Sequence, residues 1–231
     1  NGTALITGAS SGLGLEFARQ LDGRVDHFIL VARRGKKLQA LAASLSTSSI
    51  IIEQDLSLAD SPGALCERIE ALGLTVDVLI NNAGVLRDKT FVKMEPADFE
   101  FVVKVHLTGS AFATKACWET FREQGYGRIL MTASSTGLFG NFGQANYGAA
   151  KLGVAGLSKC IAIDMERFGV RSNCIAPFAY TRMVATIPQT DANEERLRIV
   201  KQMGPEKIAP FVVSLMTDEA SDVTAQIFGV R

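Results

Sequence analysis

The sequence predicts an α/β protein built on a doubly wound parallel sheet of about seven strands, with helices on both faces. The first observation is that short apolar runs rich in Ile and Val alternate with helical segments along the whole chain. The second is that no Pro/Gly/Ser-rich linker, charge run or internal repeat divides the 231 residues, which favours one domain over 1–231. Right-handed crossovers in such a sheet place ligands at the carboxyl ends of the strands.

The apolar runs define the expected strands in order. The first half of the chain carries TALITG, HFILVA, SIIIEQDL and VDVLIN, and the second half carries GRILMTAS, VRSNCIA and AQIFGV. Strands are therefore expected at 3–8, 27–32, 49–56, 76–81, 127–134, 170–176 and 225–230.

Helices are expected between these runs. The first, GLGLEFARQL, is amphipathic, and in the segment 144–169 the apolar residues Leu152, Leu157, Ile161 and Met165 recur near the helical period. The helices are expected at 12–21, 35–45, 60–72, 97–123 and 144–169, with further helices between about 183 and 217.

Composition excludes several classes of function. The 24 basic and 24 acidic side chains give a net charge of +0, so nothing indicates a nucleic-acid or anionic-membrane partner. No apolar run approaches the ~20 residues that a membrane span requires, and the N-terminus does not have a signal-peptide pattern. The cysteines have neither metal nor redox spacing, which predicts no metal site and reduced thiols in a cytoplasmic protein. They are Cys66, Cys117, Cys160 and Cys174.

The stretch TGASSGLG lies between the first strand and its helix. Glycines at Gly8, Gly12 and Gly14 allow a tight turn and let backbone N–H groups approach a pyrophosphate. The alternative is a glycine-rich turn without a ligand, but the strand–turn–helix context favours dinucleotide binding.

The end of the second strand bears on cofactor choice. An NAD site usually has a carboxylate there for the ribose hydroxyls, whereas this chain has Ala32 followed by Arg33 and Arg34. Two guanidinium groups can pair with a 2′-phosphate, so the sequence favours NADP, with NAD as the alternative. Ser11 adds no positive charge to the glycine-rich turn, and Arg34 has the alternative role of a solvated loop residue.

Two further strand ends carry polar residues. Asp55, after the third strand, could accept a hydrogen bond from an adenine amino group or could cap the turn in DLSLADS. Asn81-Asn82-Ala83-Gly84 ends the fourth strand, where small and amide residues leave room for a cofactor and tie strand ends together. A simple turn is the alternative for this tetrapeptide.

A tyrosine and a lysine four residues apart, Tyr147 and Lys151, share one face of the expected helix 144–169. A free phenol titrates near pH 10, which is too high for proton transfer at neutral pH. A neighbouring ammonium favours the phenolate, and we expect Lys151 to lower the pKa of Tyr147. The pair would then act as a general acid and base. For an isolated YxxxK the alternative, a half-buried aromatic residue and a solvated lysine, is favoured, but here the other motifs supply what a tyrosine acid needs.

These motifs, TGxxxGxG, NNAG, Ser134, YxxxK and the IAP at 175–177, resemble those of the short-chain dehydrogenase/reductase family in order and spacing over essentially the whole chain. The resemblance implies a Rossmann-type sheet and hydride transfer between a nicotinamide and a carbonyl carbon. It implies that Ser134 orients the substrate oxygen, that Tyr147 transfers the proton, and that Lys151 binds the nicotinamide ribose. The cofactor contacts that it implies are Gly8, Ser10, Ser11, Gly12, Leu13, Gly14, Arg33, Arg34, Asp55, Leu56, Asn82, Ala83, Gly84, Tyr147, Lys151, Pro177, Phe178 and Thr181.

A closer resemblance lies within the family. RDKTFVKM at 87–94 and KVHL at 104–107 are similar to the (3R)-hydroxyacyl-CoA dehydrogenase unit of peroxisomal multifunctional enzymes, and GNFGQANY is shared with 3-oxoacyl reductases. This implies a 3-oxoacyl or 3-hydroxyacyl thioester substrate. A steroid or xenobiotic carbonyl reductase is the alternative, and a non-catalytic NADP-binding sensor is the alternative of another class. The family also implies a homodimer or homotetramer through the helices at 97–123 and 144–169, and a substrate lid at 184–206.

The chain departs from the family pattern at three places. His106 stands where most members have Asn, and it either relays protons or is a packed helix residue. Ala32 and Arg33 stand where the hydroxyacyl-CoA branch carries Asp and uses NAD. Pro177 is followed by Phe178 in place of Gly, and Phe178 either covers the nicotinamide or belongs to the core.

Overall fold

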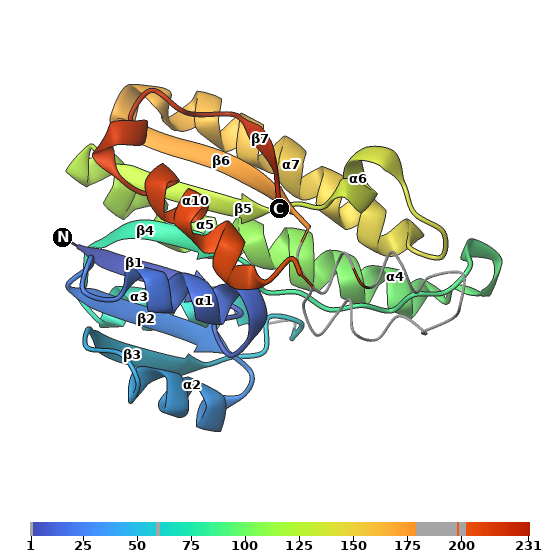
Figure 1. The fold of residues 1–231 in the computed structure, drawn as a ribbon, viewed down its shortest axis with the longest axis horizontal. Coiled ribbons are helices and arrows are strands. Elements are labelled where there is room, and N and C mark those ends of the chain that lie inside the picture. Colours follow the sequence, from blue (N-terminus) through green and yellow to red (C-terminus); the bar gives the residue numbers. More distant parts are fainter. Residues whose placement is uncertain (1, 59–60, 179–197, 199–201) are drawn as a thin grey trace.

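A computed structural model describes residues 2–58, 61–178, 198 and 202–231, without the side chains of residues 61 and 62. It contains one seven-stranded sheet in the order β3-β2-β1-β4-β5-β6-β7, with every neighbouring pair parallel (Figure 1). The predicted fold class is confirmed. The strands are β1 Thr3–Thr7, β2 His27–Ala32, β3 Ser48–Glu53, β4 Val76–Asn81, β5 Gly127–Thr132, β6 Val170–Pro177 and β7 Ile227–Val230.

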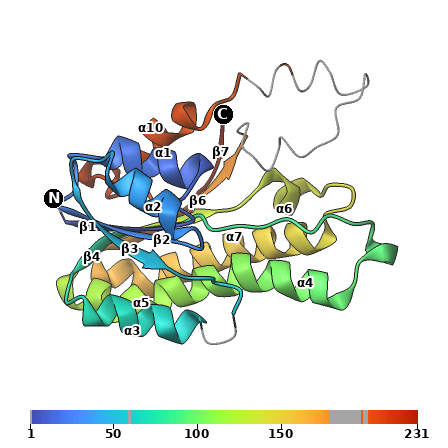
Figure 2. The same ribbon diagram turned by 90° about the horizontal axis from the view of Figure 1, so that it is seen from below.

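Helices cover both faces of the sheet, as Figure 2 shows with the sheet seen nearly edge-on. One face carries α1 (Gly12–Leu21), α2 (Gly35–Ala42) and α10 (Pro205–Leu215). The opposite face carries α3 (Ser61–Ala71), α5 (Gly109–Gln124) and α7 (Ala145–Met165), with α4 (Pro96–Val103) packed against α7. Short helical turns complete the described chain: α6 Ser135–Phe139, η1 Phe91–Lys93, η3 Glu166–Phe168 and η5 Asp218–Ala220.

The sheet divides the hydrophobic interior into two cores. Side chains alternate along a strand, so Ala4 and Ile6 of β1 face α1 and α10, whereas Leu5 faces the α5–α7 side. All five residues of β1 are buried because it lies at the centre of a sheet with both faces covered. This is why its three central residues, Ala4, Leu5 and Ile6, are all apolar.

The strand order reverses at β1, which pairs with β2 on one side and β4 on the other. Successive crossovers therefore leave β1 and β4 toward opposite sides of the sheet and open a crevice at their carboxyl ends. The glycine-rich turn after β1 and the NNAG segment after β4 both lie at this crevice.

Several boundaries differ from the predictions by one to four residues, and three differences bear on the site. The helix expected at 97–123 is α4, a π-helical segment η2 (Lys104–Thr108) and α5 in succession. A short helix, α6, follows β5 where strand was expected to continue to 134. β3 ends at Glu53, short of residue 56, because the Asp55 carboxylate accepts a hydrogen bond from the Ser57 N–H at 2.9 Å and closes a turn.

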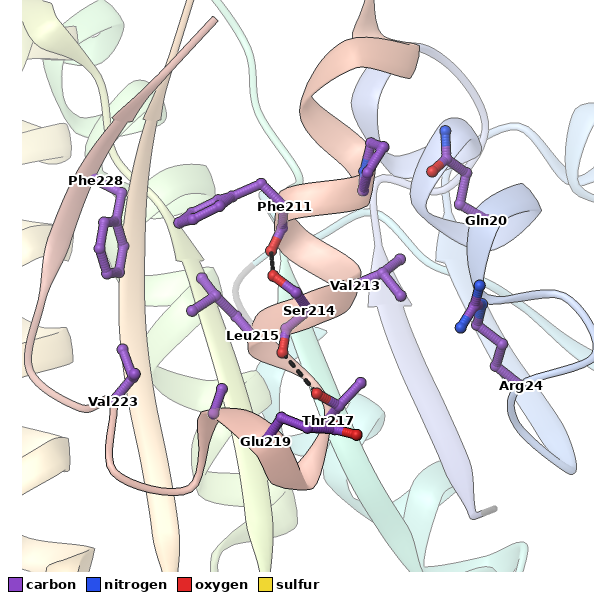
Figure 3. A pocket seen from close by; sticks show the side chains of 12 residues that line it. Gln20, Arg24, Phe211, Val213, Ser214, Leu215, Thr217, Glu219, Val223 and Phe228 are labelled. Carbon is purple, nitrogen blue, oxygen red and sulfur yellow. Dashed lines mark hydrogen bonds between the residues drawn. The ribbon is translucent and has the colours of Figure 1, made fainter.

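A hollow of about 650 Å³ lies beside α10, away from the crevice. Figure 3 shows Phe211 of α10 directed toward Phe228 of β7, and their ring centroids are 5.0 Å apart. None of the predicted site residues within the described ranges lines this hollow.

No helix in the described part of the chain is both long and apolar enough to cross a membrane. Among the same residues no cluster of three or more His, Cys, Asp or Glu side chains could hold a metal ion. All four cysteines are free thiols.

Candidate active site

The glycine-rich turn and the end of β4 are packed against each other. Gly8 has a φ of +69°, and a Cβ on it would lie 2.8 Å from Ala83 Cα. A Cβ on Gly14 would lie 2.5 Å from Asn82 Nδ2. Thr7 Oγ1 accepts from the backbone N–H of Asn82 at 3.0 Å and of Ala83 at 3.2 Å. The prediction that NNAG ties neighbouring strand ends together is therefore confirmed, and the glycines leave the close-approach surface that a dinucleotide requires.

Arg34 reaches the glycine-rich turn. Its guanidinium donates to Ser10 Oγ at 2.7 Å and to Ser11 Oγ at 2.8 Å. The alternative that Arg34 is only a solvated loop residue is therefore wrong. Arg33 points elsewhere, with a side chain 55% exposed and its Nη1 4.0 Å from Asp55 Oδ2.

Asp55 makes the contacts of a turn cap. Its Oδ1 accepts from the Ser57 N–H at 2.9 Å and from Ser57 Oγ at 2.7 Å. The capping interpretation describes these contacts, and a contact to adenine stays a prediction. Leu13 and Leu56 are both buried, in the cores on opposite faces of the sheet.

His106 lies in the π-helical segment η2 and is 1% exposed. Its Nε2 is 2.8 Å from the Val85 carbonyl oxygen and 3.1 Å from the Val85 nitrogen, so it donates or accepts according to the tautomer. Nδ1 has no hydrogen-bond partner among the described residues. A Cβ on Gly84 would lie 2.6 Å from His106 Cε1, which is why a glycine is required beside the ring. π-helical turns of this kind interrupt α-helices most often at functional sites.

The three predicted catalytic side chains are brought together at the carboxyl end of β5. Ser134 caps α6, and its Oγ accepts from the Thr136 N–H at 3.2 Å. Lys151 is buried and donates from Nζ to the Thr132 carbonyl at 2.6 Å. Nζ lies 5.6 Å from the centre of the Tyr147 ring, and the His106 ring meets the same ring edge-on at 5.2 Å.

The electrostatics of this group correct one prediction. Burial raises the pKa of Tyr147 above its ordinary value and outweighs a hydrogen bond with Ser134 that acts in the opposite direction. Burial also lowers the pKa of Lys151 to about 8. The expectation that Lys151 holds the phenol below its ordinary pKa is therefore wrong for this structure. The physical reason is that removal from water disfavours both charged forms, and the ammonium is directed at the Thr132 carbonyl.

His106 is neutral in this environment. Burial, and then the charge of Lys151, hold its pKa well below the ordinary histidine value. We therefore expect His106→Asn to leave the pH profile of kcat/KM between about pH 5 and 8 unchanged, and to retain turnover within about tenfold, since a working acid–base group contributes about 10²–10⁴-fold. Steady-state kinetics across this range test it. An ionisation that disappears in the variant would show that His106 relays protons.

Some polar residues of the site lie outside the predicted set. Asn146 is completely buried, and its Nδ2 donates to the carbonyls of Arg87 at 3.0 Å and Asp98 at 3.3 Å. Its only signal in the sequence is an amide in helical register with apolar Ala150 and Val154. Asp88 and Gln144 also join the site and carry no recognisable spacing.

The last of the predicted cofactor contacts lie at the end of β6 and just beyond it. Phe178 donates its backbone N–H to the Val230 carbonyl at 2.8 Å, and its side chain is 45% exposed, so it is not a core residue. Pro177 ends β6 beside it. Thr181 lies outside the described residues, as does the predicted lid at 184–206 apart from residues 198 and 202–206.

A doubly wound parallel sheet whose glycine-rich crevice opens beside a Ser/Tyr/Lys group defines the class of dinucleotide-dependent oxidoreductases. The chain belongs to the short chain dehydrogenase family, whose model matches residues 2–192. It is an oxidoreductase of that family.

Its relatives include longer peroxisomal proteins, of which it covers only a part, and proteins of which it covers most of the length. The chain is 39% identical to a peroxisomal hydratase-dehydrogenase-epimerase of Saccharomyces cerevisiae, over 97% of this chain and 25% of the relative. It is 36% identical to a putative short-chain type dehydrogenase/reductase of Mycobacterium tuberculosis, over 94% and 78% respectively. It is 31% identical to a 3-oxoacyl-[acyl-carrier-protein] reductase of Aquifex aeolicus, over 99% and 95%. The chain thus spans 25% to 52% of the length of the peroxisomal relatives it matches.

Proposed function

We propose that this protein interconverts a ketone and a secondary alcohol on a 3-oxoacyl or 3-hydroxyacyl thioester, with NADP as the preferred cofactor. The observation that carries the proposal is the convergence of Ser134, Tyr147 and Lys151 at the carboxyl end of β5, on the same edge of the parallel sheet as the glycine-rich turn after β1. The thioester is supported by relatives whose names are those of 3-oxoacyl reductases and of peroxisomal hydratase-dehydrogenases. We treat residues 1–231 as one domain, in which 184–206 covers the substrate.

The residues at the crevice fit a nicotinamide dinucleotide. Glycine at positions 8 and 14 lets the turn pack closely against Asn82 and Ala83, and a glycine-rich turn that leads into a helix can offer backbone N–H groups to a pyrophosphate. The turn from Gly8 to Gly14 would hold the phosphates, and Asn82 to Gly84 would border the half of the cofactor that carries the nicotinamide. When bound, the nicotinamide supplies or accepts the hydride at the carbonyl carbon.

The chain's own groups handle the substrate oxygen. Ser134 Oγ accepts from the Thr136 N–H and is hydrogen-bonded to Tyr147, so a substrate oxygen that enters between the two hydroxyl groups could take the Ser134 hydrogen. Tyr147 gives that oxygen a proton on reduction and removes it on oxidation. Lys151, on the same helix face as Tyr147, would contact the nicotinamide ribose.

Arg34 is the residue that we expect to recognise a 2′-phosphate. Its contacts with Ser10 and Ser11 hold a positive charge at the turn, whereas Arg33 is more exposed. Arg34→Ala should weaken NADPH binding about tenfold or more, since hydrogen bonds to charged groups contribute about 1.5–3 kcal/mol, with little effect on NADH. Fluorescence titration with both cofactors measures this, and Arg33→Ala is the matched variant. Equal losses for NADPH and NADH in Arg34→Ala would contradict the preference for NADP.

The function itself is tested by cofactor oxidation with acetoacetyl-CoA, run with NADPH and NADH in parallel and with a panel of ketones. Turnover of the thioester with NADPH preferred is the expected result. Activity confined to bulky ketones would indicate a steroid or xenobiotic carbonyl reductase. Tight NADPH binding without any turnover would indicate a cofactor sensor.

We further propose a homodimer or homotetramer that pairs through α5 and α7. These helices expose the apolar side chains of Phe112 (42%), Leu152 (54%) and Ile163 (72%). The mass in solution by light scattering tests the assembly. The free thiols support a reducing compartment such as the cytoplasm, and fractionation of cells would distinguish it from the peroxisome that several relatives are named for.

A further inference from the structure

The residues just ahead of Tyr147 are hydrogen-bonded to the consecutive residues 87–89. The Lys89 N–H donates to the Gly143 carbonyl at 2.9 Å. Gln144 Nε2 donates to Asp88 Oδ2 at 2.8 Å. Asn146 Nδ2 donates to the Arg87 carbonyl at 3.0 Å. The start of α7 thus holds Asp88 beside the predicted catalytic group.

Asp88 is connected to Ser134 by a short hydrogen-bonded path. A carboxylate only accepts, so it fixes the amide nitrogen of Gln144 toward Asp88 and turns the amide oxygen the other way. That oxygen accepts from Thr136 Oγ1 at 3.1 Å, and the Thr136 N–H donates to Ser134 Oγ at 3.2 Å. The position of the Asp88 charge is therefore set relative to Ser134.

Asp88 differs from the neighbouring carboxylate Asp98 in its charged surroundings. In the described part of the chain, no lysine or arginine forms an ion pair with it. The neighbouring carboxylate Asp98, by contrast, lies 2.7 Å from Lys89 Nζ and 4.0 Å from Arg87 Nε.

Several groups face Tyr147 from the elements packed around it. Lys151 lies on the same helix, His106 comes from η2 and is neutral, Ser134 caps α6, and Asp88 precedes η1. After burial, the charge of Asp88 is the remaining cause that raises the pKa of Tyr147. A substrate that brings a second negative charge close to the phenol would be repelled by the Asp88 carboxylate.

We propose that Asp88, held by Gln144, is a specificity-determining residue that selects substrates with an uncharged group next to the reacting ketone. A thioester, ester or amide satisfies this condition, whereas a free 3-oxo acid places a carboxylate two carbons from the ketone and is repelled. The inference rests on the proposed function, because it concerns the substrate of the same site.

The test compares two small ketones of equal acyl length, the N-acetylcysteamine thioester of acetoacetate and acetoacetate itself, with NADPH. The ratio of their kcat/KM values should favour the thioester in the wild type, and Asp88→Asn should reduce this ratio by about two- to fivefold, the range expected for an exposed charge. The wild-type ratio should also fall with added salt, and the variant ratio should not. Glu95→Gln removes an exposed carboxylate that lies close enough to act on Lys89 but forms no hydrogen bond or ion pair with the described residues 143–147, and it should leave the ratio unchanged.

A double-mutant cycle with Gln144→Ala tests whether Gln144 acts by holding the Asp88 carboxylate in place. If Gln144 acts by holding Asp88, its removal lowers the ratio in the wild type and has no further effect on the ratio in Asp88→Asn. A ratio that Asp88→Asn leaves unchanged, with the thioester still turned over, would overturn this inference alone. A wild type that turns over neither compound would instead overturn the proposed function.

Discussion

Tyr147→Phe is expected to lower kcat for the 3-oxoacyl thioester by about 10³–10⁴-fold, at the upper end of what one general acid–base group contributes. The substitution removes only the phenolic oxygen. The ring that meets His106 at 5.2 Å and lies 5.6 Å from Lys151 Nζ is retained. The site should therefore keep its shape and lose its proton donor.

Two measurements distinguish this from a loss of folding. NADPH affinity, followed by fluorescence titration, should change less than about threefold, because the glycine-rich turn does not involve the phenol. Tyr126→Phe is the matched control, since Tyr126 stacks under Arg128 at 4.3 Å near the opposite end of the sheet and should keep full turnover. Activity retained in Tyr147→Phe would show that another group transfers the proton.

Lys151→Met is expected to lower kcat by about 10²-fold or more, because it removes the ammonium that would position the nicotinamide ribose while keeping a long unbranched side chain. It should also change how stability depends on pH. The pKa of Lys151 is lowered from 10.5 to about 8 by burial, so between these values the unfolded chain binds more protons than the folded one. Unfolding free energy therefore rises with pH across this window.

The size of that rise follows from the shift. Each pKa unit corresponds to about 1.4 kcal/mol, so Lys151 contributes up to about 3 kcal/mol of increasing stability between pH 8 and 10.5. Chemical denaturation at several pH values should show this rise reduced in Lys151→Met. Cys174 has the opposite effect: its pKa is raised to about 11 in the folded protein, so it lowers the stability of wild type and variant alike as the pH rises. The effect of Lys151 is therefore taken from the difference between the variant and the wild type.

Lys159→Met is the control for this experiment. Lys159 lies on the same helix with an exposed side chain, so its replacement should leave both turnover and the pH dependence of stability unchanged. An identical pH dependence in wild type and Lys151→Met would show that Lys151 is not desolvated in the folded protein.

The fold class, the strand positions to within a few residues and the predicted catalytic group could all be predicted from the amino-acid sequence. Buried parallel strands require continuous apolar runs, and the close approach at Gly8 and Gly14 requires glycine. Tyr147 and Lys151 share a helix face through local geometry alone. Signals of this kind are local, and they can be read from one segment at a time.

Only the tertiary structure decided the environment of those residues. The π-helical turn that brings His106 against Val85, the reach of Arg34 to Ser10 and Ser11, and the raised pKa of Tyr147 all depend on segments distant in sequence. The link between Asp88 and Gln144 joins residues 56 positions apart. Burial and charge are sums over neighbours in space, and a spacing rule within one segment does not contain them.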